Sequence, residues 1–163
     1  MRKVKVVWWI VVAVSCCIAS AQESKPPAQT PAAQKDGREY SGMYAFLKEG
    51  EFVQITVEDN GGVTGFVSRY GDDKVTFVDQ FFKNAKIDGN KLSFSTKVVN
   101  GLAFDFKGTV ERGEGKNPGD EGYFVLKGTL TEDLTDANKK TTSNSRDVEL
   151  REFPGDAGAD GKK

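Results

Sequence analysis

Apolar side chains recur at every second position through much of the segment 39–153, and this alternation limits what the chain can fold into. Valine and isoleucine alternate with polar residues along 53–57, and leucine and phenylalanine do so along 102–107. Because successive side chains of a strand point to opposite faces, each such segment has one buried and one solvent-exposed face. No stretch keeps an apolar period of 3.6 for the ~10 residues that a helix requires. The pattern therefore predicts an all-β domain.

Short turn sequences separate the apolar segments. Asparagine, aspartate and glycine, which tolerate positive φ, stand at 59–62, 71–73, 88–90 and 100–101. Short turns make sequential strands antiparallel neighbours, so we expect a single antiparallel meander. The eight strands are predicted near 39–47, 51–58, 62–70, 73–86, 90–99, 102–112, 121–132 and 144–153.

Two related pentapeptides indicate how the sheet closes. The sequence FKGTV at 106–110 resembles LKGTL at 126–130, so Gly108 and Gly128 take equivalent strand positions. A glycine inside a strand permits a sharp bend. Eight strands with glycine bends and no helix to cover a flat sheet predict closure into a small barrel. The junctions 113–120 and 133–143 are longer than tight hairpins, and such loops commonly carry binding residues, although a simple solvated connection is the alternative.

The N-terminus has the layout of a secretory signal. Arg2, Lys3 and Lys5 precede an apolar run over 6–19, and Ala-Ser-Ala follows at 19–21. We expect a cleaved signal peptide over 1–21 and a secreted or periplasmic product. Lipidation at Cys16 is the alternative, and an uncleaved anchor is just short of the ~17–25 residues that a span requires.

The segments on either side of the domain contain no large apolar side chain. Residues 22–38 are rich in proline, alanine and glutamine, and residues 154–163 are mainly glycine, aspartate, alanine and lysine. Such segments cannot bury enough surface to offset their ordering entropy. We therefore expect a disordered linker at 22–38, one β-barrel domain at 39–153 and a disordered tail at 154–163.

Composition excludes several classes of function. There is no histidine, and both cysteines lie in the signal, which removes the commonest general base, thiol chemistry and the usual metal ligands from the mature chain. Removing Arg2, Lys3 and Lys5 leaves 20 basic and 24 acidic residues, a net charge of −4 that does not favour nucleic acid. No calcium loop, phosphate loop or nucleophile elbow is present. We expect no catalytic residues, no metal and no cofactor.

Two carboxylates interrupt the apolar segments. Asp105 alternates with phenylalanines and is expected on the outer face. Asp79 shares its face with Phe77 and Phe81, so an inward position with a lysine or arginine partner is a second interpretation. The aromatic residues carry the binding hypothesis, because they would either fill the core or line a ligand cavity. The residues assigned to ligand binding are Tyr44, Phe66, Phe77, Phe81, Phe94, Phe104 and Phe106.

Gly42, Met43 and Tyr44, which open the first strand, resemble the GxW motif of lipocalin-type and avidin-type barrels. The resemblance implies an eight-stranded barrel, and it implies that Arg146 or Arg151 packs on the motif residue. Here Tyr44 replaces the motif tryptophan, and both tryptophans of the chain lie in the signal. Since avidin-like sites surround their ligand with tryptophans, the resemblance argues against biotin as the ligand.

These observations predict a non-catalytic exported β-barrel module, expected to be a monomer, that binds a small apolar ligand or a protein partner of the cell envelope. The alternative is an envelope protein inhibitor acting through the loop 113–120. A hydrolase built on paired carboxylates, and an eight-stranded outer-membrane barrel, rank below these.

Overall fold

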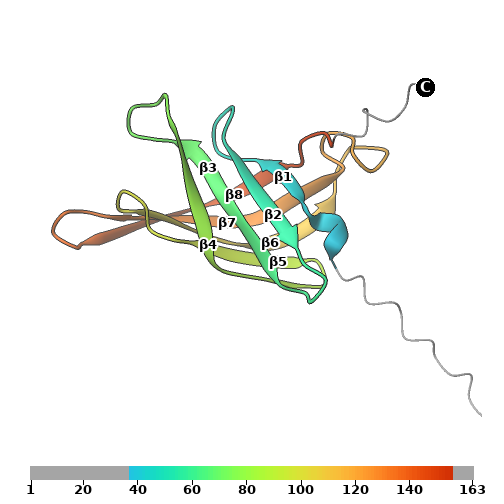
Figure 1. Ribbon diagram of the computed structural model, residues 1–163, viewed down its shortest axis with the longest axis horizontal. Helices are drawn as coiled ribbons and strands as arrows, with labels where there is room; N and C mark the ends of the chain where they lie inside the picture. The colour runs from blue at the N-terminus through green and yellow to red at the C-terminus, as the bar shows by residue number, and fades with distance from the viewer. Residues whose placement is uncertain (1–36, 156–163) are drawn as a thin grey trace, which may run out of the picture. The chain divides into compact units, whose positions relative to one another are not determined.

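The computed structural model describes residues 37–155, which form one eight-stranded antiparallel sheet (Figure 1). A short 3₁₀ helix, η1 (Arg38–Tyr40), precedes it. The predicted signal peptide, most of the linker and most of the tail lie outside these residues. The strands are β1 (Gly42–Ala45), β2 (Phe52–Val57), β3 (Val63–Tyr70), β4 (Phe77–Asp88), β5 (Lys91–Thr96), β6 (Leu102–Arg112), β7 (Phe124–Thr135) and β8 (Thr141–Arg151).

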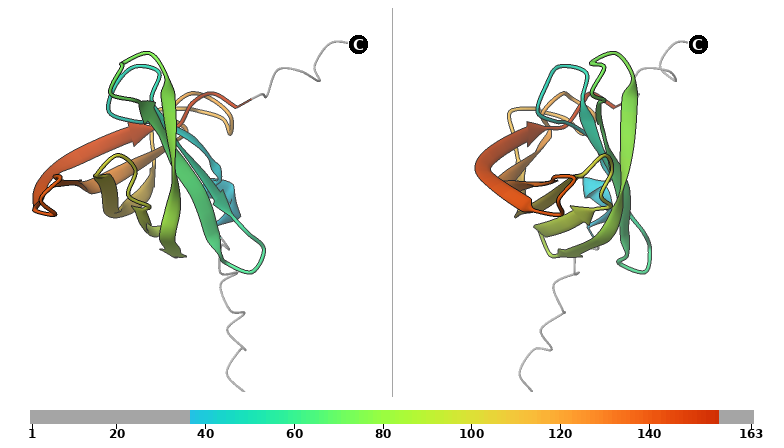
Figure 2. Two further views of the ribbon diagram at one scale, coloured as in Figure 1. Left: turned by 60° about the vertical axis from the view of Figure 1, so that its left-hand side comes forward. Right: turned by 90° about the vertical axis from the view of Figure 1, so that its left-hand side faces the viewer.

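The strands follow one another as a meander, β1 to β8 in order, as the short turns predict. The sheet curls strongly, so that β7 and β8 turn back toward the first strands (Figure 2). Closure is limited: Tyr44 of β1 pairs with Glu152, and the Phe153 amide donates to the Met43 carbonyl at 2.8 Å. The fold is therefore an all-β meander curled into a half-barrel whose two ends meet at one point.

The predicted long loop at 133–143 is wrong, because most of it is strand. Asp133 pairs with Ser143 and Thr135 with Thr141, leaving a turn of 136–140. Hydroxyl groups support the pairing: Ser143 donates to the Asp133 carboxylate at 2.6 Å, and the two threonine hydroxyls share a hydrogen bond of 2.9 Å. Polar residues occupy both faces here, so no apolar alternation marks these strand ends in the sequence.

The core lies inside the curl and is built by the alternation read from the sequence. Val53, Ile55, Phe104, Phe106 and Leu130 are all buried and belong to one apolar cluster. Burying each large apolar side chain contributes about 1.5–3 kcal/mol, which makes this cluster the main source of stability.

A polar network is embedded in this core. Gln80 is fully buried; its carbonyl accepts from Arg69 Nε at 2.5 Å, and its amide nitrogen donates to the carbonyls of Lys97 and Leu102. Arg69 also donates to the Tyr70 carbonyl at 2.9 Å. Buried polar groups need such partners, and through them Gln80 of β4 joins β3 to the loop after β5 and to the first residue of β6.

Candidate functional site

Four of the predicted ligand-binding residues lie inside the curl. Tyr44, Phe94, Phe104 and Phe106 are each at most 3% exposed. The Phe94 ring stacks between Phe82, at 4.5 Å between centroids, and Phe106, at 5.3 Å. These side chains pack on one another. They fill the core, which is the first of the two roles expected for the aromatic residues.

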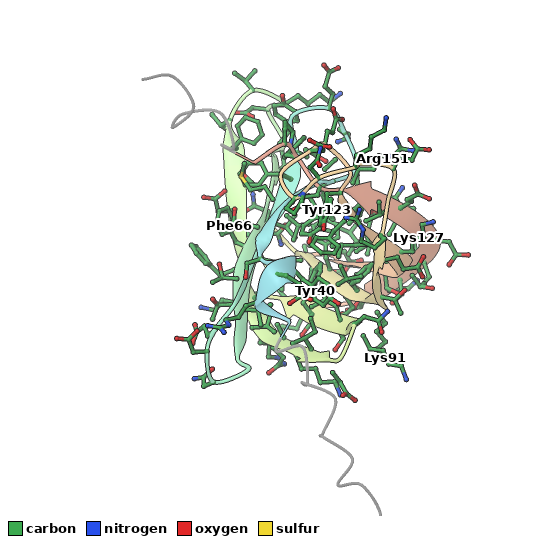
Figure 3. All side chains as sticks on the ribbon, turned by 90° about the vertical axis from the view of Figure 1, so that its right-hand side faces the viewer. Tyr40, Phe66, Lys91, Tyr123, Lys127 and Arg151 are labelled. Carbon is green, nitrogen blue, oxygen red and sulfur yellow. The ribbon has the colours of Figure 1, made fainter. Side chains whose placement is uncertain are left out.

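The other three predicted binding residues lie on the outer face of β3 and β4, so the expectation that they join the core is wrong. Phe77 is 50% and Phe81 55% exposed. Figure 3 shows Phe66 projecting outward from the curl, and its ring lies 5.5 Å from that of Phe81. Between Phe77 and Phe81 in β4, Gln80 is the residue that points inward. Its hydrogen bonds offset the cost of burying a polar side chain there.

The two embedded carboxylates also point outward. Asp79 is exposed and accepts a hydrogen bond from Ser68 Oγ at 2.7 Å, so its inward interpretation with a basic partner is wrong. Asp105 lies on the outer face of β6, as alternation predicts. Among residues 37–155, no group of three or more acidic, histidine or cysteine side chains is placed to hold a metal ion.

A hollow opens where β3 and β4 separate. Phe66 pairs with Phe81 and Gly62 with Lys86, and between these pairs β3 has residues 63–65 while β4 has residues 82–85. The extra β4 residue produces a bulge at the start of the β4–β5 pairing. The hollow has a volume of about 390 Å³ and is lined by Val63, Thr64, Gly65, Phe81, Phe82, Lys83, Asn84, Ala85 and Lys97. We call it the β3–β4 hollow.

Both an apolar and a cationic surface line the β3–β4 hollow. Phe81 supplies an exposed ring, and Phe82 is half-buried and stacks on Phe94 of the core. Lys83 and Lys97 are exposed, and neither ammonium group lies within 4 Å of a carboxylate of the described residues. No acidic residue lines the hollow. The sequence pattern assigned Phe81 to binding but did not indicate the two lysines. Lys83 reaches this hollow because it lies in the β4 bulge, and Lys97 because it directly follows β5.

The loop 113–123 is braced from the end of β6. The Arg112 guanidinium lies 3.3 Å from the centroid of the Tyr123 ring and donates to the carbonyls of Tyr123 and Gly115. Hydrogen bonds from the Asn117 and Lys116 amides to the Asp120 carboxylate hold the pKa of that group below its usual value. The loop is thus held by its own contacts, and its role as an inhibitory segment stays a prediction.

Tyr44 fixes the point where the half-barrel closes. Its hydroxyl donates to the Tyr40 carbonyl at 2.8 Å, and burial, together with nearby Glu152, raises its pKa. The expected packing of Arg146 or Arg151 on Tyr44 is wrong. Arg146 pairs with Glu132 and Arg151 with Glu114 and Glu149. The residue opposite Tyr44 is Glu152, because the strand pairing continues one residue past β8.

No family model and no curated protein matches this sequence. The fold does match solved structures of rhizavidin. One crystal structure superposes with a TM-score of 0.54 at 11% identity over 75% of this chain and 88% of rhizavidin. The rhizavidin–biotin complex superposes with a TM-score of 0.50 at 11% identity over 76% of this chain and 97% of that chain. The likeness confirms the avidin-like β-barrel fold. In the part of the chain that the structure describes, no helix is long and apolar enough to cross a membrane.

Proposed function

We propose that the chain is an exported, non-catalytic binding module that takes a small apolar molecule carrying an anionic group. The observation that supports this most directly is the β3–β4 hollow, where exposed Phe81 lies beside Lys83 and Lys97 with no acid in the lining. An exposed aromatic ring supplies apolar contact area, and an ammonium group without a partner is available to a carboxylate.

The backbone of the β3–β4 hollow adds hydrogen-bonding capacity. No ladder pair of the described sheet joins 63–65 to 82–85, so the edges that β3 and β4 turn toward each other are not paired along this stretch, although their other edges pair with β2 and β5. Peptide groups without a partner bind water or a ligand. An apolar body against Phe81, with its acid at the lysines, would use each of these features.

One of the similar solved structures is a complex with biotin, which supports small-molecule binding as a use of this fold. Biotin itself is not the ligand that we propose, because no tryptophan lies after residue 9 and packed aliphatic and aromatic side chains occupy the interior of the curl. The absence of histidine, with cysteine only at positions 16 and 17, supports a role without catalysis.

Export is part of the proposal and rests on the signal-like segment 1–21. The intact mass of the exported protein decides its form. A mature chain starting at Gln22 supports a secreted or periplasmic product, whereas a chain starting at Cys16 with added acyl mass would show a lipoprotein instead.

Calorimetric titration of the chain 22–163 tests the ligand class. We use 3-phenylpropanoate and decanoate as probes, and the corresponding alcohols as uncharged controls. Both acids should bind more tightly than their alcohols, because only the acids can use the lysines. Phe81→Ala should weaken both acids by about tenfold, the loss of roughly one aromatic contact.

A matched variant distinguishes binding in the β3–β4 hollow from non-specific binding to exposed aromatic rings. Phe77→Ala removes a ring of similar exposure from the same outer face of β4, but Phe77 does not line the β3–β4 hollow. It should leave binding unchanged. The double change Lys83→Ala and Lys97→Ala should remove the preference for acid over alcohol. Equal effects of Phe77→Ala and Phe81→Ala, or an unchanged preference in the lysine variant, would refute this site.

A further inference from the structure

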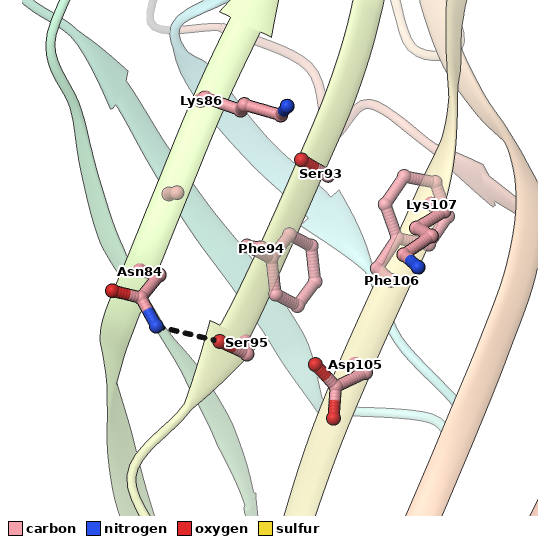
Figure 4. Close-up of a pocket in the computed structure, with 9 residues that line it drawn as sticks. Asn84, Lys86, Ser93, Phe94, Ser95, Asp105, Phe106 and Lys107 are labelled. Carbon is pink, nitrogen blue, oxygen red and sulfur yellow. Dashed lines mark hydrogen bonds between the residues drawn. The ribbon is translucent and has the colours of Figure 1, made fainter.

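A second hollow region lies on the outer face of β4, β5 and β6, next to the β3–β4 hollow, with which it shares Asn84 and Ala85. The strand register aligns Lys86 with Ser93 and Ser93 with Lys107, and the next row contains Asn84, Ser95 and Asp105. Figure 4 shows these two rows side by side. The middle strand carries short serines and the flanking strands carry longer side chains, so the surface is lowest along β5. We call this surface the β5 trough.

The β5 trough consists of two adjoining hollows. One, of about 220 Å³, includes both rows. The other, of about 490 Å³, shares Lys86, Ser93 and Lys107 and continues past Lys91 to Gly108. From Lys91 to Ser95 the trough extends about 13 Å at the usual strand rise, so it has the shape of a site for an elongated ligand.

The charged groups of the β5 trough are not paired with one another. Within the described residues, Lys86, Lys91 and Lys107 have no carboxylate within 4 Å. By contrast Lys127, on the next strand of the same face, pairs with Glu111 at 3.8 Å and Glu149 at 3.6 Å. The one hydrogen bond between side chains lining the first hollow joins Asn84 to Ser95 at 3.5 Å. Donors and acceptors along the trough are therefore open to a ligand.

The mixture of groups identifies the class of ligand. Three ammonium groups favour an anion, while the Asp105 and Asp88 carboxylates can only accept hydrogen bonds and so require a ligand that donates. A polyphosphate has no such donors, and the two carboxylates would repel it. A peptide strand has no free backbone edge to pair with here, since β5 is paired on both sides. Sugar hydroxyls donate and accept, and uronic acids carry the negative charge.

We propose that the β5 trough binds an acidic oligosaccharide, with its carboxylates at the lysines and its hydroxyls at Ser93, Ser95 and Asp105. This site adjoins the β3–β4 hollow at Asn84 and Ala85, but its lysines, serines and Asp105 do not line that hollow. It would let the module attach to a uronate-bearing polysaccharide while the neighbouring β3–β4 hollow holds a small molecule.

Titration of the chain 22–163 with tri-galacturonate tests the proposal, with maltotriose as the neutral control and tripolyphosphate as the charge control. Tri-galacturonate should bind at least about tenfold more tightly than either control. The double reversal Lys86→Glu and Lys107→Glu should abolish binding. Single reversal of Lys140, an exposed lysine in the β7–β8 turn, should have little effect. No binding of tri-galacturonate, or tighter binding of tripolyphosphate, would overturn the proposal.

Asp105→Ala separates sugar recognition from simple charge attraction. It makes the trough more positive, so a site that only attracts anions would bind tri-galacturonate more tightly. A site in which Asp105 accepts from a sugar hydroxyl should instead bind it about tenfold more weakly. Thermal melts of each variant establish that it is folded before titration. Tighter binding by folded Asp105→Ala would exclude the proposed mode.

Discussion

Gly108 of β6 faces Gly128 of β7 directly, and a Cβ atom added to Gly108 would lie 2.8 Å from the Gly128 Cα atom and 2.2 Å from the Lys127 carbonyl oxygen. A Cβ on Gly128 would similarly lie 2.3 Å from the Lys107 carbonyl oxygen. Real Cβ atoms do not approach backbone atoms so closely. The two strands can approach as they do only because both positions are glycine.

We therefore predict that Gly128→Ala lowers the free energy of unfolding by about 3 kcal/mol or more, at or above the upper end of the usual cost of overpacking. Denaturant melts measure the change. Gly89→Ala is the control: φ is +59° at this turn, but a Cβ there would meet nothing within 4 Å. It should cost only the strain of positive φ, about 1–2 kcal/mol. A smaller cost at Gly128 than at Gly89 would contradict the close approach.

Phe104→Ala should cost about 3–5 kcal/mol, because it removes a ring that is 2% exposed and packs edge-on against Phe46 at 5.1 Å. Asp105→Asn, at the next position but on the outer face, should cost little. Chemical unfolding of the two variants gives the comparison directly. If the aspartate change were the more damaging, the assignment of inner and outer faces of β6 would be wrong.

Gln80→Leu should destabilise the protein by roughly 2–3 kcal/mol or more, since it leaves the buried Arg69 Nε without its acceptor and removes the side-chain donor to the Lys97 carbonyl. The Leu102 carbonyl keeps the Val99 amide as a donor. Replacing both polar residues, with Arg69→Met and Gln80→Leu, should be less destabilising than the sum of the single changes. A double-mutant cycle by denaturant melts measures this coupling. Simple additivity would show that the two side chains act separately.

Glu152 should make folding stability depend on pH. Partial burial raises the pKa of its carboxyl group, against the effects of the Phe124 amide and Arg112. The protonated form is thus favoured in the folded state, so this contribution is fully present below the unfolded pKa of about 4.3 and is lost as pH rises through the raised value.

Glu152→Gln isolates that contribution, because the glutamine carbonyl can still accept from the Phe124 amide. Relative to the variant, the wild type should become less stable between pH 4 and pH 7 in denaturant titrations. A constant difference across that range would mean that Glu152 has the same pKa in both states. Asp73 and Asp120, whose pKa values are lowered by hydrogen bonds, are common to both proteins and cancel in this difference.

The class and order of the fold follow from the sequence alone. Alternation along segments such as 102–107 separates the inner from the outer face, and turn residues such as those at 88–90 make neighbouring strands antiparallel. Both signals are local, so they need no partner elsewhere in the chain. The repeated KGT segments likewise predict that Gly108 and Gly128 are equivalent, and the register places them opposite each other.

The candidate sites depend on contacts that no local pattern encodes. Nothing near Gln80 in the sequence indicates that it, and not Phe81, faces the core; the distant carbonyls of Lys97 and Leu102 stabilise that choice. The β3–β4 hollow needs a bulge that shifts the register by one residue, and the β5 trough needs three strands aligned side by side. Alternation decides which residues share a face of one strand, whereas register between strands, set by the whole packed sheet, decides which side chains meet.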